Sequence, residues 1–159
     1  ITADILKRYS FADTAPKENF THTRETVSLT VKKNIYDTLL KPLGYPESFK
    51  FEMDRVFDGQ KQAYKDCEDS PILVYGDSWS WIYSEMSAGF TAQLAADLSM
   101  PVSFKWQNSG GSLLPVLIKR RPELLKGRKI LVWLFSSKFL WCNPTEYNRP
   151  DSWIKVKLD

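Results

Sequence analysis

The sequence predicts a single α/β domain, a three-layer α/β/α sandwich built on a mainly parallel sheet. Three short apolar runs, at 72–75, 102–106 and 129–135, have the pattern of strands that are buried on both faces. Stretches with helical periodicity separate these runs, and strands that alternate with helices typically form right-handed crossovers in a parallel sheet. The length of 159 residues fits one domain with a sizeable core.

Helices are expected on either side of the second strand. Residues 80–98 place an apolar side chain at every fourth position, which is the stripe of an amphipathic helix. A glycine-containing turn after the second strand leads into a shorter helix over 113–124, and Gly127 breaks it. The tail at 153–159 is expected to add an edge strand.

A further helix is predicted ahead of the first strand. Apolar residues recur every four positions between 24 and 40, again the spacing of an amphipathic helix. Thr23 can cap its first turn and Gly44 lies beyond its end. This assignment places His22 at a helix N-terminus, next to a loop, and leaves 45–70 as a loop with a short helix. The stripe consists of Val27, Val31, Ile35 and Leu39.

The composition excludes several classes of protein. With 43% hydrophobic and 26% charged residues, the chain is expected to be folded rather than disordered. A net charge of +3 is too small to argue for a nucleic-acid partner. No apolar stretch approaches the roughly 20 residues that a membrane span needs. The chain begins at Ile1 and has no signal peptide, so we expect a processed protein or a piece of a longer one.

Cysteine and histidine are scarce. Cys67 and Cys142 could form one disulfide in an oxidising compartment, or remain two small buried hydrophobic residues. His22 is the single histidine, so no Cys/His cluster with metal-ligand spacing exists. Neither a metal ion nor an organic cofactor is predicted.

Polar segments follow each of the three predicted strands, at 76–78, 107–112 and 136–143. Ligands of such sheets bind beyond the carboxyl ends of the strands. Ser78 lies where a strand turns into a helix, which exposes its hydroxyl and aims the free N–H groups of the first helical turn at the reacting centre. The sequence therefore predicts an acyl-transfer nucleophile, although Gly-Asp-Ser is also a common turn composition.

Four segments resemble a known family. The string VYGDSWS at 74–80 resembles the first block of the SGNH (GDSL-type) hydrolases, and WQNSGGS at 106–112 resembles their second block. NFTHTRETVSL at 19–29 is similar to the histidine motif of the alginate O-acetyltransferase-like branch. LLKGRKILVWLFSSKFL at 124–140 resembles the third strand of that branch.

The resemblance implies a serine–histidine mechanism. Ser78 would be the nucleophile and His22 the base that takes the hydroxyl proton. The backbone N–H groups of Ser78 and of Gly110 or Gly111 would hold the oxyanion. Asn108 and Asn143 are the candidates for the asparagine of the family, which normally follows the third strand.

The same resemblance leaves the supporting acid open. The family's acidic residue two positions before the histidine is Phe20 in this chain. The carboxylate is therefore either missing or supplied by another residue. The candidates are Glu18, Asp13 and Glu25.

The activity implied by the resemblance is carbohydrate O-acetyl transfer or acetyl-ester hydrolysis through an acyl-enzyme. The substrate would be a polysaccharide or an acetylated small molecule, with an acetyl-donor membrane protein as a further partner. The resemblance places such a protein in the periplasm or outside the cell. The alternative is a catalytically degenerate SGNH-like module that binds polysaccharide or a partner protein, and Phe20 in the acid position favours it. A flavodoxin-like domain with a phosphorylated ligand at Ser78 is a third hypothesis, which the lack of a Gly-rich phosphate loop opposes.

Aromatic and basic residues lie near the predicted site. Four tryptophans at or near strand ends could stack on sugar faces, or could be partly buried packing residues. They are Trp79, Trp81, Trp106 and Trp141. The basic run KRRPELLKGRK at 119–129 could attract a polyanion, or could be a solvated helix end.

Overall fold

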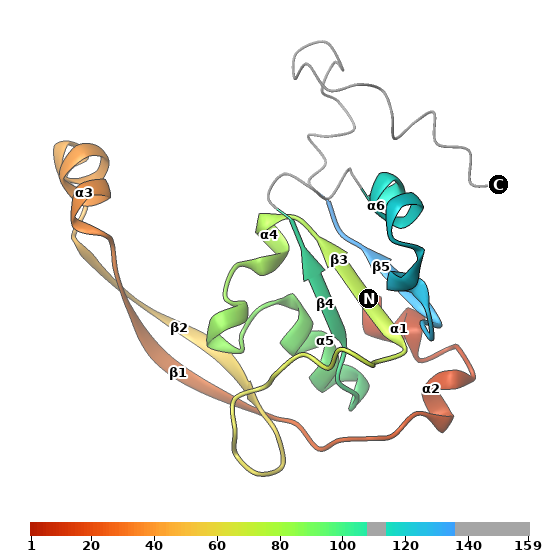
Figure 1. The fold of residues 1–159 in the computed structure, drawn as a ribbon. Coiled ribbons are helices and arrows are strands. Elements are labelled where there is room, and N and C mark those ends of the chain that lie inside the picture. The colour runs from red at the N-terminus through yellow and green to blue at the C-terminus, as the bar shows by residue number, and fades with distance from the viewer. Residues whose placement is uncertain (108–113, 136–159) are drawn as a thin grey trace.

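The centre of the domain is a parallel sheet of three strands with the order β4–β3–β5 (Figure 1). The computed structural model describes residues 1–107 and 114–135. The strands are β3 (Ile72–Gly76), β4 (Ser103–Trp106) and β5 (Ile130–Trp133). In register, Gly76 pairs with Trp106, and Ile72 pairs with Ile130. All three runs predicted as strands are therefore strands, and the predicted parallel pairing is confirmed.

The order of the strands sends the two crossovers in opposite directions. The chain moves from β3 to one neighbour through α5 (Phe90–Leu98), and then from β4 across to β5 through α6 (Leu114–Arg120). Because parallel crossovers are right-handed, the rule expects α5 and α6 on opposite faces. The carboxyl end of β3 is thus a topological switch point, the place where such sheets bind ligands.

The main core lies on the face of the sheet that α5 covers. Ile72 and Val74 point to this face, where Leu94 and Leu98 of α5 pack against them. Helix α1 (Thr2–Leu6) closes the same cluster with Ala3 and Leu6. Successive strand residues alternate faces. Leu73 and Tyr75 therefore point to the opposite face, and they too are buried. Both faces of β3 are covered, which is why its sequence is continuously apolar.

The helix predicted over 24–40 is wrong for its first half. Residues Thr21–Thr30 form strand β1, which pairs antiparallel with β2 (Ser48–Phe57). Residues four apart also lie on one face of a strand, so the observed spacing does not distinguish the two structures. The pairing shows what the apolar side chains do: Val27 lies opposite Phe51, and Leu29 lies opposite Phe49. β2 also replaces part of the loop predicted over 45–70.

The far end of this hairpin is helical. A short helix α3 (Lys33–Ile35) continues as a π-helical turn η1 (Tyr36–Leu40) and a 3-10 turn η2 (Lys41–Leu43). Gly44 ends the run in a left-handed conformation with φ of 75°. The second half of the predicted helix and its glycine stop are therefore confirmed. Figure 1 shows the hairpin projecting from the domain, with α3 at its outer end.

The helix predicted over 80–98 is divided into three pieces. These are α4 (Ser78–Trp81), the 3-10 turn η3 (Ser84–Met86) and α5. Tyr83 and Ser87 flank η3 with left-handed φ values of 65° and 56°, which a continuous helix does not allow. The apolar stripe continues through the break, so periodicity alone does not reveal it.

The remaining described elements are short. Helix α2 (Phe11–Thr14) follows α1, and a 3-10 turn η5 (Pro122–Leu125) follows α6. Gly127 has a left-handed φ of 76° after that turn, in agreement with its predicted role as a helix breaker. The predicted edge strand at 153–159 lies outside the described residues.

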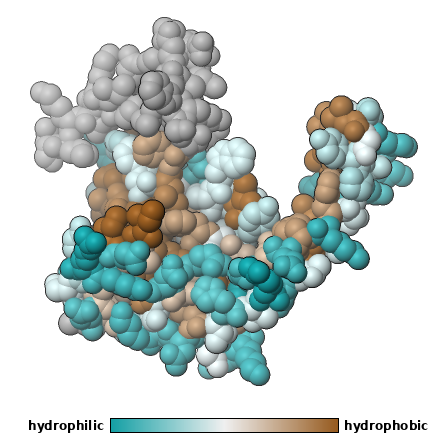
Figure 2. All heavy atoms as spheres, turned by 180° about the vertical axis from the view of Figure 1, so that it is seen from behind, coloured by the Kyte–Doolittle hydropathy of each residue, from teal (hydrophilic) through white to brown (hydrophobic). Residues whose placement is uncertain are grey.

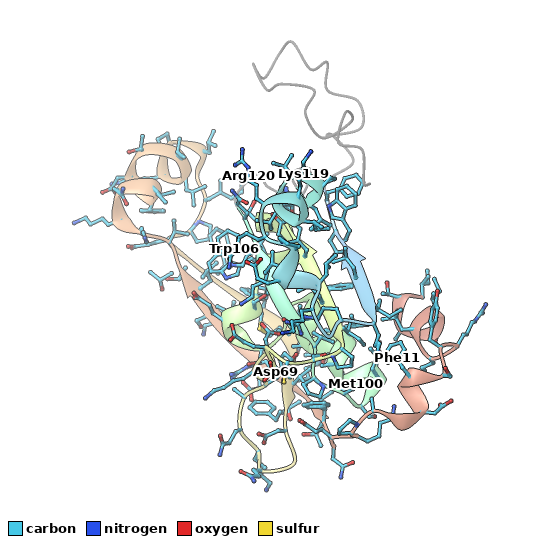
Figure 3. All side chains as sticks on the ribbon, turned by 45° about the vertical axis from the view of Figure 1, so that its right-hand side comes forward. Phe11, Asp69, Met100, Trp106, Lys119 and Arg120 are labelled. Carbon is cyan, nitrogen blue, oxygen red and sulfur yellow. The ribbon has the colours of Figure 1, made fainter. Side chains whose placement is uncertain are left out.

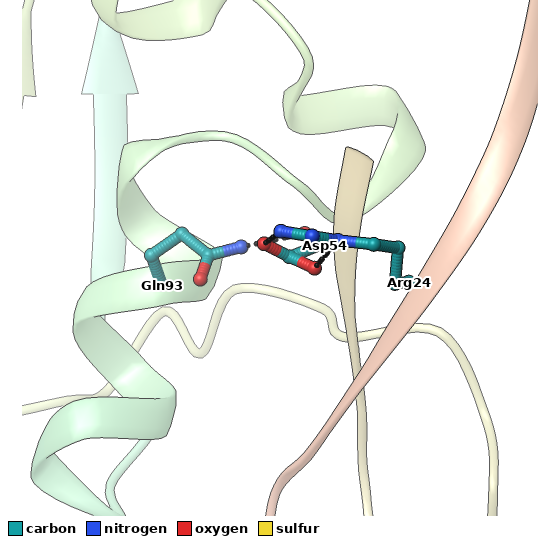
Figure 4. Close-up of polar contacts among 3 residues, drawn as sticks. All are labelled: Arg24, Asp54 and Gln93. Atoms are coloured by element: carbon teal, nitrogen blue, oxygen red, sulfur yellow. Dashed lines mark hydrogen bonds and ion pairs between the residues drawn. The ribbon is translucent and has the colours of Figure 1, made fainter. Parts of the chain in front are cut away.

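A second apolar cluster holds the hairpin against α5. Val56 of β2 is fully buried among Tyr64, Ala92 and Ala95. Polar contacts strengthen this attachment (Figure 4). The Gln93 side chain of α5 donates to the Asp54 carbonyl oxygen at 2.7 Å, while the Arg24 guanidinium holds the Asp54 carboxylate through two bonds of 3.0 Å.

Candidate active site

Ser78 is the first residue of α4, directly beyond the carboxyl end of β3. Asp77 caps the helix, since its carboxylate accepts a hydrogen bond of 3.0 Å from the Trp79 N–H. The Ser78 side chain is half-buried, whereas Asp77 and Ser80 on either side are buried. A serine at a strand-to-helix turn thus reaches the surface of the domain, as the sequence predicted.

The turn requires glycine at position 76, because the structure leaves no room there for a side chain. A Cβ atom at Gly76 would lie 1.9 Å from Ser80 Oγ and 2.6 Å from Ser80 Cβ. Ser80 occupies that space in order to donate a hydrogen bond of 2.6 Å to the Asp77 carbonyl oxygen. Gly76 and Asp77 of the Gly-Asp-Ser string therefore each meet a structural requirement of the turn.

The segment after β4 begins beside this turn. The Gln107 N–H donates to the Gly76 carbonyl oxygen at 3.1 Å, and its side chain meets the Tyr75 hydroxyl at 3.3 Å. The predicted oxyanion-hole residues Asn108, Gly110 and Gly111 lie outside the described residues. Their roles remain predictions.

His22 is not at a helix N-terminus but on strand β1, where its side chain is exposed. It lies opposite Val56. The Val56 carbonyl accepts from the Tyr64 N–H, and the Tyr64 hydroxyl accepts from the Val102 N–H at the start of β4. Ser78, in contrast, follows the other end of the sheet. Within the described part of the chain, no hydrogen bond joins His22 to Ser78, and their pairing remains a prediction.

The ends of the sheet can be followed in Figure 3. Met100 and Asp69, which precede β4 and β3, lie toward one end, while Trp106 lies toward the other. Lys119 and Arg120 at the end of α6 are on the same side as Trp106. The carboxyl ends of β3 and β4 thus lie on the side of the sheet where Trp106, Lys119 and Arg120 are found.

The candidate supporting carboxylates have other surroundings. Glu25 forms an ion pair of 2.8 Å with Arg55, and Asp13 and Glu18 are exposed on segments before β1. Asp54, which was not among the carboxylates predicted from the sequence, interacts electrostatically with His22. Its hydrogen bond with Arg24 lowers the pKa of the Asp54 carboxyl, and His22 lowers it further. No sequence motif marks Asp54, because the strand pairing brings it there.

Phe20, in the place of the family's acid, is a packing residue. Its ring meets Tyr64 edge-on with centroids 5.6 Å apart. It also packs against the cluster that contains Val56 and Ala92. An aromatic ring at this position therefore stabilises the base of the hairpin, and no carboxylate occupies the place.

A cleft of about 470 Å³ opens between the turn at 84–87 and the end of β4; Trp81 of α4 is in its wall, and Ser78 is not among its lining residues. Trp81, one turn after Ser78 in α4, stacks on Trp106 at the end of β4 with ring centroids 5.0 Å apart. Both indoles are partly exposed. The cleft is lined by Ala63, Tyr64, Lys65, Asp66, Trp81, Ser84, Glu85, Ser87, Thr91, Phe104 and Trp106.

Of the predicted sugar-contact residues, Trp81 and Trp106 are thus brought together. Trp79 is 68% exposed and does not line the cleft, and Trp141 lies outside the described residues. Asp66, which was not among the site residues predicted from the sequence, lies in the cleft wall. Burial raises the pKa of the Asp66 carboxyl, against the lowering effect of its hydrogen bonds with Tyr64 and Thr91. Burial also raises the pKa of the Tyr64 hydroxyl.

One wall of the cleft is fastened to the hairpin. Arg55 of β2 donates to the Met86 carbonyl oxygen at 2.8 Å, and the Val56 N–H donates to the Ser87 carbonyl oxygen at 2.8 Å. The Ser87 hydroxyl in turn donates to the Tyr64 carbonyl at 3.2 Å. The turn at 84–87 therefore contacts the hairpin on one side and lines the cleft on the other.

The described residues contain neither a cluster of metal ligands nor a membrane-spanning helix. Across 1–107 and 114–135, no three His, Cys, Asp or Glu side chains are grouped in a way that would hold a metal ion. Within that part of the chain, no helix has both the length and the apolar character to cross a bilayer. Cys67 is half-buried, while Cys142 lies outside the described residues, so their pairing remains a prediction.

Two solved structures share this architecture. The O-acetyltransferase domain of Pseudomonas putida AlgJ matches with a TM-score of 0.60 and 17% sequence identity, over 96% of this chain and 51% of that one. The chain has an AlgJ-like fold. Pseudomonas aeruginosa AlgX matches with a TM-score of 0.53 and 17% identity, over 85% of this chain and 30% of that one. Neither a protein-family model nor a curated protein matches.

These matches confirm the predicted resemblance to alginate O-acetyltransferase-like proteins at the level of the fold. The predicted class is confirmed as mixed α/β with a small parallel sheet, to which the structure adds an antiparallel hairpin. The chain spans about half the length of the AlgJ chain.

Proposed function

We propose that this chain is an acyl-transfer domain in which Ser78 carries an acetyl group, as a carbohydrate O-acetyltransferase or acetylesterase. The observation that carries the proposal is the turn at Ser78. A partly exposed hydroxyl stands at the switch point of an AlgJ-like sheet, beside an aromatic cleft. The AlgJ domain is named for O-acetyl transfer, and the likeness extends the same chemistry to this chain as a proposal.

The proposed reaction has two half-reactions. Ser78 Oγ attacks the carbonyl carbon of an acetyl ester, its proton passes to a base, and the donor oxygen leaves with a proton to give acetyl-Ser78. A sugar hydroxyl or water then attacks the acetyl group and frees the serine. The Ser78 N–H at the start of α4 has no partner within the helix and is proposed to stabilise the oxyanion with Gly110 or Gly111. No cofactor takes part.

The cleft is the proposed place of the acceptor. Indole faces stack on the C–H faces of sugar rings, and Trp81 and Trp106 present such surfaces one helical turn from Ser78. Asp66 and Glu85 could accept hydrogen bonds from sugar hydroxyls. The proposed substrate is therefore a polysaccharide or a small acetylated saccharide.

The proposed mechanism needs a base that takes the Ser78 proton. His22 is the proposed base, as the only histidine of the chain. To act on Ser78, it would have to approach from the hairpin, because the structure holds it on β1 opposite Val56. Loss of the base from a serine triad costs several orders of magnitude in rate.

The position of His22 favours one second candidate. A noncatalytic module that binds polysaccharide or a partner protein needs the cleft but no Ser–His contact. Phe20 packed in the core, where the family has its acid, points the same way.

The setting of the protein is proposed from the same likeness. We place it in the periplasm or outside the cell, with an acetyl-donor membrane protein as a partner. The complete domain is proposed to be a three-layer α/β/α sandwich, with α6 in the layer opposite α5.

Acetylation of Ser78 is the test. The chain is mixed with 4-nitrophenyl acetate, and nitrophenol release is followed together with the mass of the intact protein. Wild type should gain one acetyl group on Ser78 and turn over, Ser78→Ala should do neither, and Ser28→Ala, an exposed serine of β1, should behave as wild type.

His22→Ala separates the two candidates. A loss of turnover of at least about 100-fold would support His22 as the base. No acetyl-Ser78 in the folded wild type, together with saccharide binding that Trp106→Ala abolishes and Ser78→Ala preserves, would replace the enzyme with the binding module.

A further inference from the structure

The hairpin carries at its outer end a segment that no other part of the described chain covers. β1 and β2 pair over ten residues each, from Thr21 opposite Phe57 to Thr30 opposite Ser48. We call residues 31–47, which connect them, the arm tip. In Figure 1 the arm tip stands away from the parallel sheet, and in Figure 2 apolar residues gather at the end of the projection.

The helical turns of the arm tip bury none of their residues. Three large apolar side chains follow one another at intervals of four, which places them along one side of the helical run. Ile35 is 42% exposed, Leu39 60% and Leu43 70%. Tyr45 and Leu29, also exposed, flank this apolar stripe.

A helical segment this short, with exposed apolar side chains, is not expected to be stable in water without a packing partner. Helices of fewer than about 12–15 residues are marginal without tertiary packing. The run from Lys33 to Leu43 is shorter than that and packs on nothing in the described chain. A set of adjacent apolar side chains at the end of a projection is typical of a surface that another molecule covers.

Charge distinguishes between the candidates for that molecule. The arm tip contains Lys32, Lys33 and Lys41 together with the two carboxylates Asp37 and Glu47, so it has a small net positive charge. Within the described part of the chain, none of these lysines is in an ion pair. Apolar side chains interspersed with unpaired lysines match a bilayer surface with anionic headgroups.

We propose that the arm tip binds the surface of an anionic lipid bilayer. Leu39 and Leu43 enter the headgroup region, and Lys33 and Lys41 meet lipid phosphates. The arm then holds the parallel sheet and its cleft at a distance from the bilayer set by the length of the ribbon. This docking does not depend on the chemistry of Ser78.

Co-sedimentation with vesicles tests the proposal. The 159-residue chain should bind vesicles of phosphatidylcholine containing phosphatidylglycerol, and bind much less to phosphatidylcholine alone or at high salt. Leu39→Ser combined with Leu43→Ser should weaken binding at least about tenfold, because two apolar side chains leave the membrane. Lys33→Gln and Lys41→Gln should each weaken it about fivefold at low salt.

The control is Ile5→Ser in α1, where Ile5 is 49% exposed and lies outside the arm. This variant should bind as wild type does, and so should Ser78→Ala. Circular dichroism should show the same fold for all variants, since every substituted tip residue is exposed.

Four results would overturn the proposal. The first two are the absence of binding to both kinds of vesicle and equal binding by the double leucine variant. The third is a dimer in sedimentation velocity that the leucine substitutions dissociate, without vesicle binding, since the stripe would then be covered by a second copy. A protein partner captured by wild type but not by the leucine variant, again without vesicle binding, would count in the same way.

Discussion

Gly76→Ala tests whether the turn at Ser78 depends on the absence of a side chain. The backbone of Gly76 does not have a left-handed φ, so the substitution is not opposed by backbone conformation. It is opposed by space, since the new Cβ would lie 1.9 Å from Ser80 Oγ. Nonbonded contacts this short do not occur. Rotation of Ser80 would move its Oγ but leave its Cβ 2.6 Å from the new atom, so α4 must move as well.

Both responses have a predictable energy, and the two costs add. When Ser80 rotates, its hydrogen bond of 2.6 Å to the Asp77 carbonyl is lost. The shift of α4 leaves a buried site overpacked, because Ser80 is only 8% exposed. A lost hydrogen bond costs about 1 kcal/mol and overpacking about 1–3 kcal/mol, so the free energy of unfolding should fall by about 2–4 kcal/mol.

The assay is urea unfolding followed by tryptophan fluorescence, with Ser80→Gly as the second arm of a double-mutant cycle. Ser80→Gly removes the atoms that the new Cβ would meet. The double variant should therefore be about 1–3 kcal/mol more stable than the sum of the two single effects predicts. Gly59→Ala is the control, because the nearest atom to its added Cβ is an ordinary 3.7 Å away. It should change stability by less than about 1 kcal/mol.

The reasoning is refuted if the two substitutions add within about 0.5 kcal/mol, since the side chain of Ser80 would then not be the obstacle. It is equally refuted if Gly76→Ala is as stable as Gly59→Ala. Acetylation of Ser78, where measured, should fall in Gly76→Ala and recover in part in the double variant.

Three further predictions concern the cleft and the hairpin. Partial desolvation in the cleft wall raises the pKa of the Asp66 carboxyl although the residue is exposed, so the folded protein binds that proton slightly more tightly than the unfolded chain does, and stability should fall slightly as pH rises above about 3.9. Asp66→Asn should therefore raise the thermal midpoint at neutral pH and have little effect at pH below that value; an equal gain at both contradicts the argument. Val56→Ala should cost about 1–3 kcal/mol in urea unfolding because Val56 is fully buried, and Val27→Ala on the half-buried ribbon clearly less. Trp106→Ala should weaken saccharide binding by at least about tenfold in calorimetry, and unchanged affinity would exclude the cleft as the acceptor site.

The parallel sheet was predictable because its signal is local. Ile72 to Tyr75 is apolar at every position, and a strand covered on both faces requires that pattern. The hairpin was not predictable from β1 alone. Val27 and Leu29 are explained as strand residues only by their pairing with Phe51 and Phe49, which lie twenty or more positions later in the chain. Spacing by four suits one face of a helix and one face of a strand equally.

The same distinction between local and long-range signals applies to the candidate site. The turn at Ser78 is encoded by adjacent residues, since Gly76, Asp77 and Ser80 shape it directly. Asp66 has no such signal, because it comes from an irregular segment that Tyr64 and Thr91 hold in place. The location of His22 follows from strand pairing, and a motif that assumes a helix misplaces it.

The bonds from Arg55 and Val56 to the turn at 84–87 give the arm a mechanical role. The outer end of the hairpin is exposed, and its inner end is hydrogen-bonded to the wall of the cleft. Amide hydrogen exchange should be slow beside Val56 and become faster toward the arm tip. A load on the outer end would be transmitted as strain to Met86 and Ser87, and thus to the shape of the space in front of Trp81.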